Sequence, residues 1–526
     1  MSGDDPQSEV LAALADPAIH GGEAVKRIDT HAAAVFLAGP RAYKIKRAVR
    51  YPFLDFSTLE KRKAACEAEL AVNRPYAPQL YRRVLPITRE PDGALALDGN
   101  GAPVEWAVEM VRFDESATLD HLADAGKIDP GLAETLAHIV AAAHERAPTA
   151  GPEPWIERLA RWLDENRDDM RRHADLFEPQ QVDHLFESSR AAWERLRPLL
   201  RARADAGLVR RCHGDLHLGN IVLIDGKPVI FDAIEFDPLI ATGDVLYDLA
   251  FLLMDLLDRG RDEAANLLLN RYLLEARRPE HLDGLAALPL FLSVRAAIRA
   301  KVAAAKRELG APDRDAIARA ARGYFALALR LIAPPAPVLV AVGGLSGTGK
   351  SVLARALGPF LPPAPGAVVL RSDIERKRMF GVAETERLPP AAYGRDEAAR
   401  VYASLTAQAR RVIAAGHSAI VDGVFADARE RVEVAAAAQA ENVCFHGLFL
   451  TADLAARLAR IAARRHDASD ATADVVRSQE SYDLGALDWT RIDAAGTRAQ
   501  TLAAARAAVS AAPEAKPGCI RGEPPA

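Results

Sequence analysis

The chain has 526 residues, which is too long for one hydrophobic core and suggests two to four domains or lobes. Half of its residues are hydrophobic and 26% are charged, a balance that excludes fibrous and intrinsically disordered proteins. The formal net charge of -5 provides no general positive field, so we expect no nucleic-acid partner.

The sequence shows no signal for export or membrane insertion. It starts with MSGDDPQSEV, which is acidic where a secretory signal is basic and then apolar. Its apolar runs stay well below the ~20 residues that span a bilayer. We therefore expect a cytoplasmic protein with no membrane partner, and the sequence leaves its oligomeric state open.

Residues 27–113 have the pattern of a small sheet that carries one helix, behind an N-terminal extension of residues 1–26. Ser57, followed three residues later by Glu60, predicts a capping box at the start of that helix. Strands are expected at residues 31–39, 41–49, 80–90, 93–99 and 104–113.

Helical periodicity dominates residues 114–332, and two short β segments interrupt it. Between those segments lies the octet HGDLHLGN, which ends at Asn220 and is followed by IVLIDGKPVIFD. Asp225-Gly226 predicts a hairpin turn in the second sequence, and a hairpin would bring Asn220 and Asp232 together at its open end.

One interpretation of the octet is a metal site. His213 and His217 are four residues apart, which suits two zinc ligands on one helix face, and Asp215 would add an oxygen. However, Gly214 and Gly219 disfavour a helix, and the glutamate of the zinc-protease pattern is missing.

Phosphoryl transfer explains more residues of the octet. An acid followed five residues later by Asn is the spacing of a kinase catalytic loop, in which the acid accepts the hydroxyl proton and the amide oxygen binds Mg²⁺. Asp215 and Asn220 have this spacing, and Asp232 supplies the second metal-binding acid that should follow a β segment.

A kinase-like small lobe also needs a lysine for the α and β phosphates and a helix glutamate to orient it. Lys44 and Lys46 are two residues apart and so face the same side of a strand, and Glu69 or Glu67 would be the partner. We favour Lys44 and Glu69, although exposed surface charges are the alternative interpretation of all four.

Four segments together resemble the aminoglycoside phosphotransferase and choline kinase family, whose fold is that of a protein kinase. They are HGDLHLGN, VIFDAIEFDP, the helix end AHERAP, and YDLA, and the resemblance covers residues 27–331. It implies that Asp215 is the catalytic base, that Asn220 and Asp232 bind Mg²⁺, that His213 supports the loop, and that backbone near residues 109–112 holds adenine. The chain departs from the family in two ways: the lysine is not preceded by a G-x-G-x-x-G loop, and IFDAIEFD replaces the usual DW-type sequence.

Prolines in the segment 333–337 end the helical pattern and predict a linker. The sequence GLSGTGKS follows and satisfies the phosphate-loop pattern G-x-x-x-x-G-K-[ST], between an expected strand and an expected helix. Lys350 would bridge the outer phosphates and Ser351 would hold Mg²⁺, while main-chain N–H groups cradle the phosphates. The predicted nucleotide-binding residues are Gly344, Leu345, Ser346, Gly347, Thr348, Gly349, Lys350 and Ser351.

Two carboxylates, Asp373 and Asp422, end apolar runs at the edge where open α/β sheets bind ligands. We expect Asp373 beside the acceptor and Asp422 to orient Mg²⁺ through water, and a helix N-cap is the alternative for each. Further on, four arginines stand at helical spacing and form either a lid that clamps phosphates, with Arg464 as a ligand, or a solvated basic face. They are Arg457, Arg460, Arg464 and Arg465.

The segments GLSGTGKS, RSDIERKR, IVDGVF and RLARIAARRHDASDAT resemble small-molecule P-loop kinases related to gluconate kinase, adenylylsulfate kinase and zeta toxins. This resemblance covers residues 338–511 and implies that Asp373 contacts the acceptor hydroxyl. Residues 512–526 are expected to form a disordered tail.

The sequence therefore predicts a mixed α/β and α+β chain, in which a bilobal protein-kinase-like domain precedes a P-loop domain with a parallel sheet. The chain resembles a bifunctional family of phosphotransferases joined to P-loop ATPases. We expect two ATP- and Mg²⁺-dependent phosphotransferase modules that act on hydroxylated small molecules. One alternative is an ATP-binding regulatory protein whose first half is a pseudoenzyme, and another is a toxin-like kinase acting on a nucleotide sugar.

Overall fold

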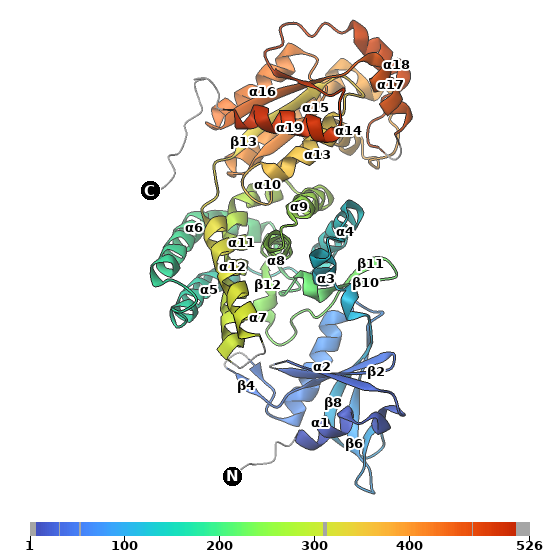
Figure 1. Ribbon diagram of the computed structural model, residues 1–526, viewed down its shortest axis with the longest axis vertical. Coiled ribbons are helices and arrows are strands. Elements are labelled where there is room, and N and C mark those ends of the chain that lie inside the picture. Colours follow the sequence, from blue (N-terminus) through green and yellow to red (C-terminus); the bar gives the residue numbers. More distant parts are fainter. Residues whose placement is uncertain (1–6, 31, 52–53, 309–312, 465–466, 512–526) are drawn as a thin grey trace. The chain divides into compact units, whose positions relative to one another are not determined.

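The computed structural model describes residues 7–30, 32–51, 54–308, 313–464 and 467–511 (Figure 1). The chain folds as two compact units, each assembled from two stretches of sequence: Met1–Arg158 with Ala204–Asp255, and Leu159–Arg203 with Leu256–Ala526. The predicted tail and Arg465 lie outside the described residues. Across the described ranges, none of the helices is both long enough and apolar enough to cross a bilayer.

The first unit is built on a six-stranded antiparallel sheet in the order β1-β2-β3-β8-β6-β7 (Figure 1). Its strands are β1 (Val25–Asp29), β2 (Ala33–Ala38), β3 (Arg41–Lys46), β6 (Tyr81–Arg89), β7 (Leu95–Leu97) and β8 (Ala102–Val111). Helix α1 (Ser8–Ala15) packs against β1 and β2, and helix α2 (Leu59–Asn73) packs against β6 and β8. The segment expected to be an N-terminal extension therefore contributes α1 to the core of this unit.

The two faces of this sheet bury separate cores, because side chains alternate along each strand. Ile45 points to the face that α1 covers. Ala42, whose side chain lies on the opposite side of the same strand, packs with Cys66 of α2 on the other face. Lys44 and Lys46 follow Ala42 by two and four residues, so their side chains lie on the same face of β3 as Ala42. Both lysines therefore point toward α2.

Helix α2 begins one residue later than predicted. Thr58 is the N-cap, and its Oγ1 accepts a hydrogen bond from the Lys61 amide at 3.3 Å. Ser57 donates instead to the Asp55 carboxylate at 2.5 Å, because the chain turns there after the short strand β5 (Leu54–Asp55). The prediction of Ser57 as the cap is therefore wrong.

The predicted hairpin is present after the octet, as β10 (Ile221–Ile224) paired with β11 (Lys227–Ile230). Asp225 and Gly226 form its turn with φ of 49° and 75°, the left-handed conformation that such a turn requires. The other elements that begin in this unit are β4 (Arg50–Tyr51), β9 (Val209–Arg211), β12 (Thr242–Asp244), α3 (Leu119–Asp124), α4 (Pro130–Arg146), α5 (Glu153–Arg171), α7 (Pro238–Ala241) and α8 (Val245–Asp258).

The second unit contains a group of helices and a parallel sheet. The helices that precede the predicted linker are α6 (Pro179–Asp205), α9 (Asp262–Ala276), α10 (Pro279–Gly284), α11 (Leu288–Glu308) and α12 (Arg314–Ile332). Helices α11 and α12 pack along each other, and Ser293 Oγ donates to the Ala328 carbonyl at 2.9 Å between them.

All strand pairs in the second sheet are parallel, in the order β14-β15-β13-β16-β17, which confirms the predicted P-loop fold. Helices α13 and α19 cover one face, where Val342 and Leu353 share a core. Helices α15 and α16 cover the other. The elements are β13 (Val338–Gly344), α13 (Lys350–Leu357), β14 (Val368–Arg371), α14 (Ser372–Met379), α15 (Arg395–Ala414), β15 (Ala419–Asp422), α16 (Ala428–Ala440), β16 (Cys444–Thr451), α17 (Leu454–Ala462), α18 (Ala473–Ser478), β17 (Thr490–Asp493) and α19 (Arg498–Ser510).

Gly447 in β16 lies against the Trp489 ring, and a Cβ at this position would collide with the indole. Gly447→Ala is therefore expected to lower the free energy of unfolding of the second unit by about 1–3 kcal/mol. Gly323 is the matched control, because a Cβ there meets nothing within 4 Å and alanine is the better helix former. Gly323→Ala is expected to raise stability by about 0.5–1 kcal/mol, and denaturant titration that gives both variants the same sign would contradict this packing.

Candidate active sites

The octet forms a turn-rich loop between β9 and β10, ending in the 3₁₀ turn η3 (Leu218–Asn220). Gly214 has φ of 84°, and a Cβ there would lie 2.9 Å from Ala241 Cα, so this turn requires glycine. A loop of this kind does not present two histidines on one helix face.

Both histidines of the octet bond to the main chain. His213 Nε2 donates to the Phe231 carbonyl at 2.8 Å, and its Nδ1 accepts from the Asp215 amide at 3.3 Å. Burial lowers the pKa of His213, which favours this neutral form. His217 Nδ1 accepts from the Gly219 amide at 3.1 Å. The histidines therefore hold the loop in shape, as the resemblance implies for His213.

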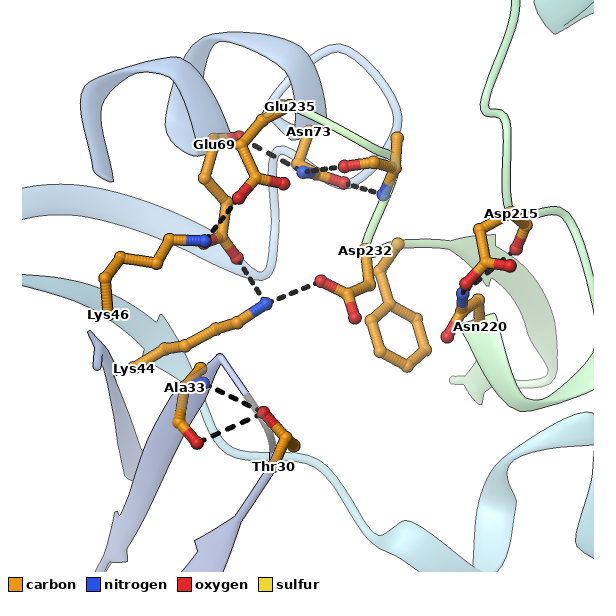
Figure 2. A network of polar contacts seen from close by, with 12 residues as sticks. Thr30, Ala33, Lys44, Lys46, Glu69, Asn73, Asp215, Asn220, Asp232 and Glu235 are labelled. Atoms are coloured by element: carbon orange, nitrogen blue, oxygen red, sulfur yellow. Dashed lines mark hydrogen bonds and ion pairs between the residues drawn. The ribbon is translucent and has the colours of Figure 1, made fainter. Parts of the chain in front are cut away.

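The predicted acid and amide meet within the loop. Asn220 Nδ2 donates to the Asp215 carbonyl at 2.9 Å and to Asp215 Oδ2 at 3.1 Å. Because the amide nitrogen is committed to Asp215, Asn220 Oδ1 is left as an oxygen donor of the kind Mg²⁺ takes. The Phe231 amide donates to the Asn220 carbonyl at 2.9 Å, which brings the chain before Asp232 next to this pair, while the Asp232 carboxylate points toward Lys44 (Figure 2).

Two aspartates of helix α8 accept hydrogen bonds from main-chain amides of the loop. Asp248 accepts hydrogen bonds from the amides of His213 (3.3 Å) and Gly214 (2.9 Å), and Asp255 accepts from the Leu218 amide (3.0 Å). Sequence reasoning gave these aspartates no role. Their signal is two acids seven residues apart, on one face of an otherwise apolar helix, which predicts buried partners.

The lysines of β3 meet three carboxylates (Figure 2). Lys44 Nζ lies 2.8 Å from Glu69 Oε1 and 2.6 Å from Asp232 Oδ1. Lys46 Nζ lies 2.6 Å from Glu69 Oε2 and is also paired with Glu235. Of the two lysines, the favoured Lys44 is the one that contacts the predicted metal acid.

Two other carboxylates behave differently from expectation. Glu67, the alternative to Glu69, is exposed on α2 and lies 3.9 Å from Lys63. Glu235, whose side chain is 7% exposed, was missed, although it falls in IFDAIEFD, where the sequence departs from the resembled family. An unexplained departure next to a metal acid was the signal that would have found it.

Alternating charges set the protonation of this network. Burial alone would lower the pKa of Lys44, but the carboxylates of Asp232 and Glu69 outweigh burial and raise it well above the ordinary value. Burial alone would raise the pKa of Glu69, but Lys44 and Lys46 hold it at about 2. Each lysine is thus cationic and Glu69 is anionic at neutral pH.

Because the pKa of Glu69 is depressed, its ionisation stabilises the fold above its ordinary pKa of 4.5, and this stability is lost as the pH falls toward 2. Glu69→Gln is expected to lower the free energy of unfolding by on the order of 2 kcal/mol at neutral pH. The difference from wild type should shrink in urea titrations below the ordinary pKa. Glu67→Gln, on the exposed side of the same helix, is the control and should change little. A deficit that does not depend on pH would contradict the network.

A cavity of about 650 Å³ adjoins the segment after β8, next to the backbone that is expected to hold adenine. The Arg112 amide donates to the Pro40 carbonyl at 2.9 Å, which ties this segment to the turn between β2 and β3. The cavity is lined by Gly39, Pro40, Arg112, Phe113, Asp114, Glu115, Ser116 and His121.

The connection between β1 and β2 spans only residues 30–32, where protein kinases carry a longer glycine-rich loop. Thr30 Oγ1 accepts from the Ala33 amide at 2.9 Å and donates to the Ala33 carbonyl at 3.1 Å. Figure 2 shows the two hydrogen bonds between Thr30 and Ala33.

The phosphate loop lies between β13 and α13, as predicted. Gly347 has φ of 87°, and a Cβ there would lie 2.7 Å from the Arg457 carbonyl, so the loop requires glycine at this position. Lys350 Nζ donates to the Leu345 carbonyl at 3.1 Å, across the mouth of the loop. Ser351 follows as the second residue of α13.

Both predicted acids of the second site act on Lys350. Burial lowers the pKa of Lys350, and the charges of Asp422 and Asp373 oppose this shift. Burial, reinforced by Asp422, raises the pKa of Asp373. Arg371 at the end of β14 has its Nε 3.5 Å from Asp422 Oδ2. Lysine and carboxylates therefore gather where these strands end.

The predicted lid arginines divide into two groups. Arg457 Nε donates to the Ser346 carbonyl at 2.9 Å, and Arg460 Nη1 donates to the Thr348 carbonyl at 3.2 Å. These two bond the outer surface of the phosphate loop, which neither the lid nor the basic-face interpretation foresaw. Arg464 pairs with Asp467 at 3.8 Å, and its buried Nη1 has no hydrogen-bond partner among the described residues.

A phosphate loop turns its N–H groups inward, so its carbonyls point outward and need donors. Arg460→Ala would remove one such donor and is expected to weaken ATP binding to the second unit about tenfold, measured by calorimetry. Arg460→Lys should recover part of this loss. Arg498→Ala, at the exposed start of α19, is the control, and equal affinity for Arg460→Ala and Arg498→Ala would contradict the anchoring role.

Two family models match the chain. The model described as "Phosphotransferase enzyme family" matches residues 55–288, and the model described as "AAA domain" matches residues 339–482. Similar proteins include an uncharacterized protein of Mycobacterium tuberculosis and one of Mycobacterium bovis. Each is 30% identical over 489 residues, which cover 90% of this chain and 93% of the relative.

Solved structures with similarity to one half of the chain include three kinases or phosphotransferases. A choline kinase from Cryptosporidium parvum shares 13% identity and covers 62% of this chain and 95% of its own, with a TM-score of 0.39. An aminoglycoside phosphotransferase from Streptomyces rimosus shares 22% identity and covers 55% and 98%, with a TM-score of 0.31. A gluconokinase from Sinorhizobium meliloti shares 20% identity and covers 33% and 95%, with a TM-score of 0.24.

Proposed function

Because the chain belongs to a family of kinase-type phosphotransferases that join a phosphotransferase domain to a P-loop domain of the AAA type, we propose that it carries two separate ATP sites. Each site transfers the γ-phosphoryl group of ATP, with Mg²⁺, to a hydroxyl group of a small molecule. The partner is thus a hydroxylated metabolite rather than a nucleic acid or a membrane.

The observation that carries this proposal is the position of the Lys44 ammonium between Glu69 and Asp232, at 2.8 and 2.6 Å. A lysine oriented by a helix glutamate next to a metal-binding acid is the arrangement that kinases use to hold the α and β phosphates. The adenine would occupy the cavity of about 650 Å³ beside Arg112, at the end of the same sheet.

In the first site, Asp215 accepts the proton of the acceptor hydroxyl as its oxygen attacks the γ-phosphorus and ADP leaves. Asn220 Oδ1 and the Asp232 carboxylate have the donor oxygens for Mg²⁺, which supplies charge neutralisation on the transferred group when bound. The hydrogen bond from Asn220 Nδ2 to Asp215 Oδ2, 3.1 Å long, fixes the base Asp215 and the metal ligand Asn220 relative to each other.

In the second site, the main-chain N–H groups of residues 344–351 bind the phosphates, and Lys350 neutralises the charge that moves with the γ-phosphoryl group. Ser351 and Asp422 would hold Mg²⁺, and Asp373 would contact the acceptor hydroxyl. Arg464, with a buried Nη1 that lacks a partner among the described residues, would bind the transferred group.

One observation favours a second candidate, an ATP-binding regulatory protein whose first half does not catalyse. Thr30 bonds to Ala33, the first residue of β2, so the connection between β1 and β2 is short. A kinase has a glycine-rich loop at this place, and that loop covers the phosphates. Without that cover, the first site would bind nucleotide and retain it unchanged.

Single substitutions in the full chain separate the two sites. Asp215→Asn is expected to lower the first activity, and Lys350→Met the second, each by about 10² to 10³ at its own site only. The measurement is ADP release over a panel of hydroxylated metabolites, together with the stoichiometry of ATP binding. Asp225→Asn is the control, because this aspartate lies exposed at the turn of the same hairpin.

The outcomes distinguish the candidates. If Lys350→Met removes all ADP release while one ATP per chain still binds, and Asp215→Asn changes nothing, the first half is a regulatory nucleotide-binding domain. If Lys350→Met abolishes turnover by both sites, they are not independent. If neither substitution lowers any ATP-dependent activity, the proposed function is wrong.

A further inference from the structure

The parallel sheet of the P-loop domain has an edge at β14, whose other side pairs with β15. An edge strand presents a row of N–H and C=O groups that need partners. In this chain, helix α9 lies at that edge, next to the end of α13 (Figure 1). Helix α9 lies within the residues that match the phosphotransferase family, whereas β14 lies within those that match the AAA domain.

The side chain of Asn270 bonds to this edge in the manner of a neighbouring strand. Its Nδ2 donates to the Ala367 carbonyl at 3.0 Å, and its Oδ1 accepts from the Val369 amide at 2.7 Å. A carboxamide has one donor and one acceptor in the geometry of a peptide group, so it pairs with residues i and i+2 of a strand as another strand would.

A second amide one turn away completes the contact. Asn266 is 3% exposed, and its Nδ2 also donates to the Ala367 carbonyl at 3.0 Å. Glycines make room for it, because a Cβ at Gly358 or at Gly366 would lie 2.7 Å from the Asn266 amide group. The fit is therefore built by both partners, α9 and the P-loop domain.

Ion pairs on either side of the amides are partly exposed to solvent and contribute less. Arg271 of α9 lies 2.7 Å from Glu384, and Asp283 of α10 lies 2.5 Å from Arg411 of α15. Partly exposed pairs of this kind add little to stability, so we assign the position of the strand to the two amides.

Strand β14 leads directly into the second site. Two residues after Val369, the strand ends at Arg371, which lies 3.5 Å from Asp422 and 3.4 Å from Asp467. Asp373 follows in the first turn of α14. The edge that Asn270 holds is thus four residues from the predicted acceptor contact.

We propose that Asn270 is a positioning residue for the P-loop site. By completing the edge of β14, α9 fixes the strand end from which Asp373 reaches the acceptor hydroxyl. Helix α9, which lies in the segment that matches the phosphotransferase family, therefore contributes to the function of the AAA-type domain. The proposal rests on the proposed function of the P-loop domain, in which Asp373 contacts the acceptor.

The test uses the full chain with Asp215→Asn as background, so that ADP release comes from the P-loop site. Asn270→Leu keeps the branched shape of the side chain and removes both hydrogen bonds to the strand. Asn270→Asp keeps the acceptor for the Val369 amide. Glu263→Ala, on an exposed position of α9, is the control. The measurements are Mg²⁺-dependent ADP release, the Kd for ATP, the melting temperature, and amide hydrogen exchange over residues 367–375.

We expect Asn270→Leu to lower kcat about tenfold and to speed exchange at Val369 and Asp373 about tenfold. The Kd for ATP should stay within about twofold, because the phosphate loop and not β14 binds the nucleotide. Asn270→Asp should recover part of the rate and most of the Val369 protection, and Glu263→Ala should match the background in every measurement.

Two results would overturn the proposal. One is faster exchange at Val369 with an unchanged kcat, which would make the contact structural only. The other is a parallel loss of kcat, ATP affinity and melting temperature, which would indicate general unfolding. If the background shows no ADP release that Lys350→Met abolishes, the proposed function has failed instead. Exchange at Asp373 then decides the positioning claim, with faster exchange in Asn270→Leu supporting it and unchanged exchange refuting it.

Discussion

The first unit is organised by a chain of paired charges that is buried at its centre. Isolated buried charges cost several kcal/mol each, so Glu69, Lys46 and Glu235, whose side chains are at most 7% exposed, need their neighbours. Strand β3 supplies two cations, α2 supplies the acid between them, and the segment after β11 supplies an acid at each end. The order of the chain is Glu235, Lys46, Glu69, Lys44 and Asp232. The small sheet, helix α2 and Asp232 are thereby held in one arrangement, and the octet joins it through the hydrogen bond between Phe231 and Asn220.

The same principle organises the P-loop site, where main-chain carbonyls are the groups that need partners. A loop that turns its N–H groups inward toward phosphate must turn carbonyls outward, and those carbonyls need donors where water does not reach. Arg457 and Arg460 are one helical turn apart on α17 and supply these donors to Ser346 and Thr348. In both sites the groups assigned to chemistry are held by side chains from elements distant in sequence, such as Asp248 and Asp255 of α8 behind the octet.

The two compact units do not coincide with the two family segments. Helix α9 falls in the phosphotransferase match, yet its amides bond the edge of the P-loop sheet within the second unit. A parallel sheet leaves an edge strand at each side, and covering one with amide side chains is a solution that needs no additional strand. The mycobacterial relatives align over 90% of this chain, so their similarity also extends across both segments.

Local patterns in the sequence determined the fold class, the hairpin of Asp225-Gly226, the phosphate loop, and the pairing of Asp215 with Asn220, because each depends on residues close together in the chain. The N-cap was wrong by one residue, since Ser57 and Thr58 both have a capping hydroxyl and the Ser57 hydroxyl bonds to Asp55 instead. Only the tertiary structure decided that Glu69 pairs with both lysines, that Glu235 closes the charge chain, that two supposed lid arginines anchor a loop, and that α9 covers β14. These choices depend on which groups are buried beside one another across long sequence separations, and hydrophobic periodicity carries no information about that.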